Sequence, residues 1–391
     1  MTVEHLLVLL AGIVVLLATA RSVLWVLIVP RPASTLIVYP MVVVRAGFRR
    51  ASHLARTFDA KDRLLAVSEP VALVALLVTW LLMTLVGFAL VDWGTGHEPF
   101  ARAFGEAGSS VFTLGFAVSH TSGSRALDFI AAGTGLVLVA LQIAYLPTLY
   151  SAYNRRETMV TLLESRAGSP AWGPEILVRH QLVGTVDHLT GLFGDWERWA
   201  ADVTESHCTY PSLLYLRSPR AKNSWIVSLL AVLDAAALEL AIDPAGAPPE
   251  ARMCLRMGFM CLRDIAQVMR IPFDPDPRPD DPIELTEATF DAAFRQLEAL
   301  GYPVSRTVDD AWAHFRGWRV NYESVAYALC YRLDAPPAPW SGPRRRFRGE
   351  SMEPSRPTDR RPGGVAPDPW RIRPRPDPVA DGTAPEGPSP A

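Results

Sequence analysis

The sequence has 391 residues, enough for two or three structural units, and its formal net charge of −2 excludes the basic excess of a nucleic-acid-binding protein. Apolar residues make up 49% of the chain and are concentrated in the first 150 positions, which is typical of a membrane module joined to a soluble one. The four cysteines, at positions 208, 254, 261 and 330, have no paired C-x-x-C spacing, so neither a disulfide framework nor a zinc site is indicated.

The first apolar run, residues 6–29, is long enough to cross a bilayer. Residues 1–5 carry no Lys or Arg, so the run lacks the basic start of a cleaved signal peptide, and we expect residues 1–30 to form a retained transmembrane helix. Arg21 is interpreted as an anchor that reaches the interface. A voltage sensor would need several arginines at three-residue spacing.

A basic segment, residues 31–68, follows the first run. Seven of its residues are Lys or Arg, against only Asp59 and Asp62, so the positive-inside rule places it in the cytoplasm. Within it, residues 36–48 are apolar but short and contain Pro40, which favours a helix in the headgroup layer. Its basic face is suited to anionic lipid, and the alternative is a solvated loop that only sets the topology.

Two long apolar runs frame a shorter one in the predicted membrane module, residues 69–151. The flanking runs, residues 71–91 and 127–150, suit a hydrocarbon core about 30 Å thick. The run between them, residues 100–112, is too short to cross, so we expect it to enter the membrane as a half-helix and return. Backbone that turns back at membrane depth needs protein or a water-filled cavity to satisfy its polar groups.

The turn after this half-helix has the composition of an ion pore. Its sequence is Ser109-Ser110-Val111-Phe112-Thr113-Leu114-Gly115-Phe116-Ala117. The threonine offers a hydroxyl, the following residues offer a row of carbonyls, and glycine accepts a positive φ without strain. We therefore interpret one stretch as a carbonyl-lined selectivity filter, braced by the two serines: Thr113, Leu114, Gly115, Phe116 and Ala117, with Ser109 and Ser110.

This order of elements resembles the pore module of the potassium channel family, whose filter reads TVGYG. With the extra N-terminal helix and a helical C-terminal domain, it is similar to bacterial two-pore-domain-type potassium channel proteins. Thr113 and Gly115 match the filter, Leu114 and Phe116 are conservative, and Ala117 stands where the family has its second glycine. The resemblance covers residues 70–151 and implies a homotetramer around a potassium or other monovalent cation, with Phe116 packed against the pore helix.

The third span carries residues that either bend a helix or let helices pack closely. By resemblance it is the pore-lining helix, in which Gly133, Gly135 and Pro147 are possible gating hinges. Glycines also allow close packing between membrane helices, so both interpretations stay open. Asp128, at the outer end of this span, either attracts cations to the pore mouth or marks the membrane boundary.

Beyond residue 152 the pattern changes to amphipathic helices, and we expect a cytosolic helical domain at residues 152–334. Helices are predicted at residues 174–189, 250–270 and 308–333, the last opened by a Thr307 cap, and another ends at Gly301. Residues 225–242 are apolar enough for a fourth span. Asp234 and Glu239 interrupt that run, so a buried helix of the soluble domain is the preferred interpretation.

Enzyme chemistry has no support from motif spacing. The densest polar cluster, residues 205–211, contains His207 and Cys208 but matches no metal-ligand spacing, and no nucleophile–histidine grouping is found. No phosphate-binding loop or dinucleotide fingerprint occurs either. We therefore predict no enzymatic activity and no cofactor.

The last segment, residues 335–391, holds 15 of the 34 prolines together with scattered arginines, and we expect it to be disordered. Arg155 and Arg156 follow the third span, whereas the loop before it has few basic residues, which indicates an outside N-terminus and a cytoplasmic C-terminus. The resulting prediction is an all-α, multi-pass protein of a bacterial plasma (inner) membrane that conducts cations passively. The rival prediction is a non-conducting, membrane-anchored regulatory or scaffold protein that keeps the pore fold.

Overall fold

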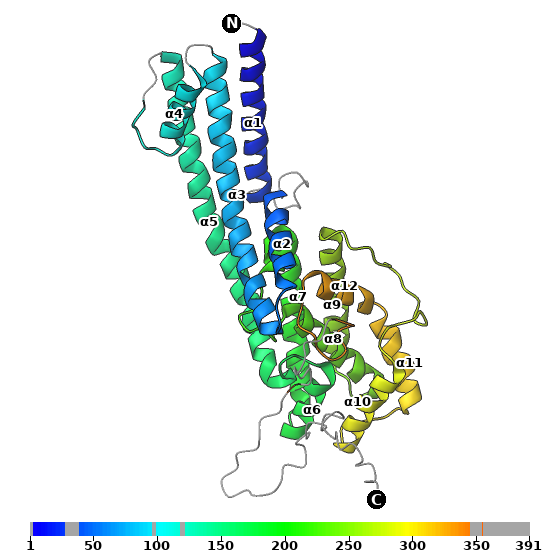
Figure 1. The fold of residues 1–391 in the computed structure, drawn as a ribbon. Coiled ribbons are helices and arrows are strands. Elements are labelled where there is room, and N and C mark those ends of the chain that lie inside the picture. Colours follow the sequence, from blue (N-terminus) through cyan, green and yellow to red (C-terminus); the bar gives the residue numbers. More distant parts are fainter. Residues whose placement is uncertain (1–2, 28–38, 96–98, 118–121, 345–353, 355–391) are drawn as a thin grey trace, which may run out of the picture. The chain divides into compact units, whose positions relative to one another are not determined.

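The computed structural model describes residues 3–27, 39–95, 99–117, 122–344 and 354. Residues 1–354 form one compact unit, and the second unit, residues 355–391, lies outside the described residues. Throughout the described ranges the regular structure is helical, with no strand (Figure 1). The predicted all-α class is therefore confirmed.

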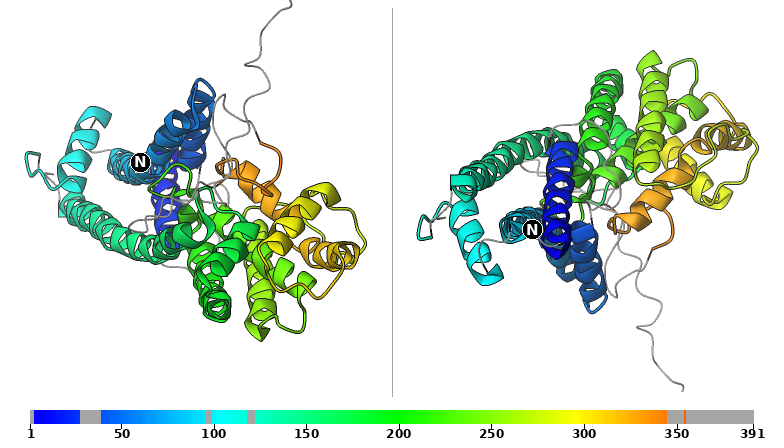
Figure 2. Two further views of the ribbon diagram at one scale, coloured as in Figure 1. Left: turned by 90° about the horizontal axis from the view of Figure 1, so that it is seen from below. Right: turned by 90° about the horizontal axis from the view of Figure 1, so that it is seen from above.

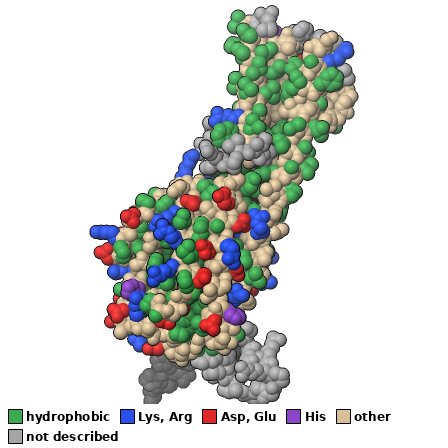
Figure 3. Space-filling view, turned by 180° about the vertical axis from the view of Figure 1, so that it is seen from behind, with side chains coloured by type: hydrophobic (Ala, Val, Ile, Leu, Met, Phe, Trp, Pro, Cys, Tyr) green, Lys and Arg blue, Asp and Glu red, His purple; other side chains and the backbone are tan. Residues whose placement is uncertain are grey.

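Three helices of the N-terminal half are long and apolar enough to cross a membrane: α1 (Val3–Leu27), α3 (Phe58–Gly94) and α5 (Ser122–Ala167). Figure 2 shows α1 beside α3, with α4 (Phe100–Val111) and α5 on the other side of α3. Much of the surface of these helices is apolar, whereas Figure 3 shows charged side chains gathered over the helical domain. These observations are compatible with a protein embedded in a membrane.

Glycines bring α1 and α3 into close contact. A Cβ on Gly87 of α3 would lie 2.7 Å from a methyl carbon of Leu16, and one on Gly94 would lie 2.6 Å from Leu9. Such small residues let helix backbones approach in the way that membrane helices pack. The buried indole of Trp80 adds a specific link by donating a 2.7 Å hydrogen bond to Ser22 Oγ.

Two of these helices extend beyond the predicted spans. The helix α3 begins at Phe58, well before residue 71, because Thr57 caps it by accepting from the Ala60 amide, and it continues through Pro70. The helix α5 runs on to Ala167, so the expected boundary at residues 151/152 falls within one continuous helix. Neither the basic segment nor the pore module therefore ends in a flexible linker.

The helix α2 (Tyr39–Ser52) corresponds to the interfacial helix predicted at residues 36–48, of which residues 36–38 lie outside the described residues. It packs along α3, and Arg45 forms a bidentate ion pair with Glu69 of α3 at 2.6 and 2.7 Å. Because Glu69 is completely buried, this pair fixes α2 against α3.

The helical domain surrounds α8 (Trp225–Ile242). Every residue of α8 is buried, so neighbouring helices already cover the surface that a lipid contact would need. Its two acids are paired inside the domain: Asp234 with Arg319 and Tyr322, and Glu239 with the hydroxyl of Tyr302. The covering elements are α5, α6 (Gly173–Val183), α7 (Leu189–Thr209), α9 (Pro249–Val268), α11 (Val308–Arg319) and α12 (Glu323–Arg332), with α10 (Glu287–Ala299) outside them.

Local signals in the helical domain agree with the structure in part. Thr307 caps α11 through the Asp310 amide, and Gly301 takes a φ of 70° after α10, both as predicted. The predicted helix 308–333 is instead two helices, separated at residues 320–322. The predicted helix 174–189 likewise ends at Val183, because Gly184 adopts the left-handed conformation, and a short 3₁₀ turn η1 (Val186–His188) follows.

The predicted disordered tail begins too early. Ala335, Ala338 and Trp340 are buried, and the Trp340 carbonyl accepts a 2.6 Å hydrogen bond from Arg319. The segment 335–344 therefore belongs to the helical domain, because its few apolar side chains fill space left beside α11 and α12. Residues 345–391, apart from Pro354, lie outside the described residues.

Candidate functional site

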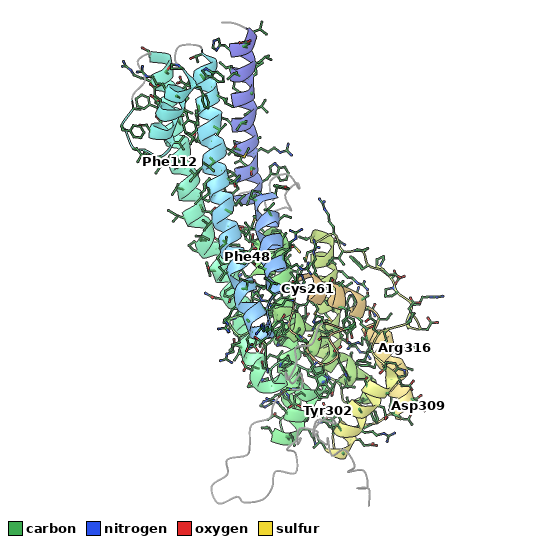
Figure 4. All side chains as sticks on the ribbon, viewed as in Figure 1. Phe48, Phe112, Cys261, Tyr302, Asp309 and Arg316 are labelled. Carbon is green, nitrogen blue, oxygen red and sulfur yellow. The ribbon has the colours of Figure 1, made fainter. Side chains whose placement is uncertain are left out.

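The site begins with α4, a 12-residue helix that packs against both α3 and α5. At about 1.5 Å per residue such a helix is about 18 Å long, too short to cross a bilayer. Figure 4 labels Phe112, where α4 ends beside α5. The predicted half-helix, residues 100–112, thus forms as a helix of nearly the expected bounds.

The carboxyl end of α4 is closed by backbone hydrogen bonds. The Leu114 amide donates to the Ser109 carbonyl at 2.8 Å, and the Thr113 amide donates to the Ser110 carbonyl at 2.9 Å. This is a Schellman arrangement, in which the residue after the cap is usually glycine. Here it is Thr113, with a φ of 54°. A β-branched residue is strained in this conformation, which the two backbone hydrogen bonds of the helix end hold in place.

A second left-handed residue follows after one intervening position. Gly115 has a φ of 72°, and no atom lies within 4 Å of the position that its Cβ would occupy. The backbone conformation, and not crowding, is therefore what requires glycine here. Leu114, between Thr113 and Gly115, keeps a negative φ, so the handedness alternates along the predicted filter.

Of the two serines, Ser109 bonds to the end of this segment, whereas Ser110 joins α4 to α5. Ser109 Oγ accepts from the Ala117 amide at 3.0 Å and donates to the Ala117 carbonyl at 3.2 Å. Ser110 Oγ donates to Asp128 of α5 at 3.0 Å. Asp128 is thus joined to the end of α4.

The expected packing of Phe116 against α4 is wrong for the single chain. Phe116 is 71% exposed and Leu114 is 64% exposed, so neither side chain finds cover within one protomer. Phe112 is partly exposed as well. The end of α4 and the following loop therefore present three large apolar side chains, at alternate positions, that the described residues leave exposed.

The possible hinge residues of α5 have different surroundings. A Cβ on Gly135 would lie 2.0 Å from the carbonyl oxygen of Val111, so Gly135 allows the end of α4 to touch the α5 backbone. Gly133 is exposed, with no atom within 4 Å of its Cβ position. Pro147 lies inside α5, which continues through it as one helix. Close packing accounts for Gly135, while Gly133 and Pro147 have no packing role of this kind in the single chain.

Sequence reasoning missed a buried polar junction at the other end of α5. Arg156 is fully buried and donates to the carbonyls of Leu213 and Leu216 at 2.7 Å each and to Glu157 at 2.8 Å. Leu213 lies in the turn η2 (Pro211–Tyr215). The Arg155-Arg156 pair is visible in the sequence only as a topology signal, because the carbonyls that Arg156 binds lie more than 50 residues away.

The segment 210–217, which we call the strap, joins α5 to α3. Arg217 pairs with Asp62 of α3 and donates to the carbonyls of Leu333 and Asp334 at 3.0 Å. Tyr153 of α5 donates to the Arg217 carbonyl at 3.0 Å. Through these bonds one short segment contacts α5, α3 and the end of α12. A displacement of α5 would therefore strain the strap.

The polar cluster at residues 205–211 serves this junction. His207 Nε2 lies 3.0 Å from Arg156 Nη1 and accepts from it when the proton is on Nδ1. Burial, and then the adjacent Arg156 charge, lower the pKa of His207 well below its usual value. Among the described residues, no group of three or more His, Cys, Asp or Glu is arranged to hold a metal ion.

Comparisons with protein-family models, with curated proteins and with solved structures found no match for the chain. The geometry described above therefore carries the functional argument.

Proposed function

We propose that the chain forms a membrane channel that conducts a monovalent cation passively, with potassium as the expected ion. In this proposal α3 and α5 cross the membrane, α4 enters it from the outer side, and residues 113–117 line the narrowest part of the pore. Passive conduction requires no covalent chemistry and no bound cofactor.

The observation that carries the proposal is the backbone of residues 113–115. In an ordinary strand successive carbonyls point to opposite sides. Alternation of positive and negative φ turns them towards one side, which is what a cation-binding row of carbonyls needs. Thr113 and Gly115 have positive φ, and Leu114 between them does not. The strain at Thr113 is of the kind that collects at functional sites.

Assembly follows from the same segment. One chain supplies one row of carbonyls, and a cation is enclosed only by several, so we infer a homotetramer with cyclic symmetry. The uncovered Leu114 and Phe116 side chains support assembly, because neighbouring protomers would bury them. A monodisperse monomer or dimer in mild detergent, measured by mass, would contradict the pore.

The decisive experiment measures potassium flux from liposomes that contain the purified full chain. The test variant is Gly115→Val and its matched control is Gly105→Val, because both glycines have open space at Cβ and only Gly115 has a positive φ. We expect flux per assembled tetramer to be lost in Gly115→Val and kept in Gly105→Val. Equal flux from both variants would exclude residues 113–117 as the filter.

One observation favours the rival, a non-conducting scaffold. Ser109 Oγ binds both the amide and the carbonyl of Ala117, so the last carbonyl of the segment is already engaged within the protomer. Alanine at this position also resists the positive φ that the family's second glycine provides. A tetramer that shows no flux for any monovalent cation would favour this rival.

A further inference from the structure

A cavity of about 250 Å³ lies between α2, α3, the strap and the end of α12. Two other cavities in the described part, of about 30 and 10 Å³, are far smaller. Four arginines line it against one carboxylate: Arg45, Arg49, Arg217 and Arg332, with Asp334. Apolar side chains, including Val42 and Leu65, form the rest of its wall.

We propose that this cavity binds the phosphate-bearing headgroup of an anionic phospholipid. Guanidinium groups suit phosphate because their fixed donors match its oxygens, and several arginines around one space concentrate that preference. The proposal concerns binding alone and does not depend on ion conduction.

Two of the arginines are already held by the protein. Arg45 is bidentate to Glu69, and its guanidinium carbon lies 3.8 Å from the centre of the Tyr215 ring. Arg217 uses its three nitrogens on Asp62 and the carbonyls of Leu333 and Asp334. These two residues shape the wall. Because Glu69 and Asp62 balance their charges, the positive charge left for a ligand comes from Arg49 and Arg332.

The other two arginines have donors to offer. Arg332 is exposed and has no hydrogen-bond or ion-pair partner among the described residues. Arg49 lies 3.1 Å from Asp334 and donates to the Tyr331 carbonyl at 3.3 Å, but Lys61 also pairs with Asp334, at 2.6 Å. Arg49 can therefore turn to a phosphate without leaving Asp334 unpaired. Because Arg49 can bind either Asp334 or a phosphate, Asp334 competes with the ligand for Arg49.

The position of the cavity indicates a lipid and not a soluble phosphate. On α3 the charged residues Asp59, Lys61 and Arg63 give way to exposed apolar ones from Val67 onward, and Leu65 and Ser68 line the cavity at this change. On α2 the exposed apolar residues come first, at 39, 42 and 43, and the arginines follow. At the cavity α2 thus changes from apolar to basic and α3 from apolar to charged, as a headgroup site requires.

The test measures binding of a short-chain, dioctanoyl phosphatidylglycerol to the full chain in mild detergent by native mass spectrometry. We expect saturable binding, and little binding of the matching phosphatidylcholine. Arg49→Gln and Arg332→Gln should each weaken binding about tenfold, since charge-assisted hydrogen bonds to phosphate are lost. Arg50→Gln is the matched control, because Arg50 lies beside Arg49 on α2, is exposed and does not line the cavity.

A fourth variant gives a change of opposite sign. Asp334 has a φ of 50°, a conformation that asparagine also tolerates, so Asp334→Asn should keep the fold. Removal of the competing carboxylate should tighten phosphatidylglycerol binding several-fold, which a folding defect would not do. Asp309→Asn, a surface change on α11, controls for net charge and should leave binding unchanged.

Three results would overturn the proposal. Equal effects of Arg49→Gln, Arg332→Gln and Arg50→Gln would mean that lipid responds only to overall charge. Binding of glycerol 3-phosphate or inorganic phosphate with the affinity of the lipid would assign the cavity to a soluble phosphate compound. Unchanged or weaker lipid binding in Asp334→Asn would show that Asp334 does not compete with a phosphate for Arg49.

Discussion

The contact between Gly135 and Val111 can be tested by adding one methyl group. In Gly135→Ala the new Cβ would lie 2.0 Å from the Val111 carbonyl oxygen, 2.9 Å from its carbonyl carbon and 3.3 Å from its Cα. Real Cβ contacts essentially never fall below 3.0 Å, so the carbonyl must retreat by at least 1.0 Å. All three atoms belong to the backbone, so no side-chain rotation relieves the clash.

The expected cost follows from overpacking. Extra methyl groups in a packed interior cost about 1–3 kcal/mol, and replacement of glycine by alanine in a helix returns up to about 1 kcal/mol. We therefore expect Gly135→Ala to destabilise the protein by about 1–2 kcal/mol and to displace the end of α4. Gly133→Ala, two residues away on α5 with open space at Cβ, should be neutral or stabilising by up to about 1 kcal/mol.

The assay heats each purified variant in detergent and measures the fraction that stays monodisperse by size-exclusion chromatography. Flux from liposomes is measured in parallel, and we expect it to fall in Gly135→Ala, because α4 carries the filter in the proposed channel. If Gly135→Ala proves as heat-resistant as Gly133→Ala, the close approach of α4 to α5 is not present in solution. If Gly133→Ala alone alters flux, Gly133 acts as a hinge.

Three more predictions concern the junction and the filter. Arg156→Gln should destabilise the helical domain by about 3–5 kcal/mol, because it leaves buried carbonyls and Glu157 without their partner. The control is Arg155→Gln at the exposed neighbouring position, which should cost less than about 1 kcal/mol. Urea unfolding followed by tryptophan fluorescence compares the two variants. The depressed pKa of His207 means that the unfolded chain binds its proton first, so stability should be full above pH 6.5 and fall below it by about 1.4 kcal/mol per pH unit. In His207→Gln this pH dependence should shrink, and an unchanged acid sensitivity between pH 6.5 and 5 would contradict the burial of the neutral ring. Thr113→Gly should stabilise the protein by about 1 kcal/mol, because glycine relieves the strain of the left-handed conformation. Flux should fall, because the threonine hydroxyl is lost. A less stable variant would mean that Thr113 is not strained.

The sequence by itself determined the features that depend on local pattern. Long apolar runs predict α1, α3 and α5, because the length of a run bounds the length of a span. The half-helix before residue 113 and the positive φ of Gly115 could be predicted, because a short apolar run and a residue without Cβ are visible without tertiary information. Asp234 and Glu239 likewise indicated that α8 belongs to a folded domain, and α8 is entirely buried there.

Only the tertiary structure decided which distant residues meet. The carbonyls that Arg156 binds, the burial of the Arg45–Glu69 pair and the ring of arginines around the cavity join segments that share no local pattern. The left-handed Thr113 could not be predicted, because threonine disfavours that conformation, and it is adopted here where the Thr113 and Leu114 amides close the end of α4 on the Ser110 and Ser109 carbonyls. The inclusion of residues 335–344 in the domain is similar: their composition resembles a solvated tail, yet Trp340 fills space that exists only once α11 and α12 have packed.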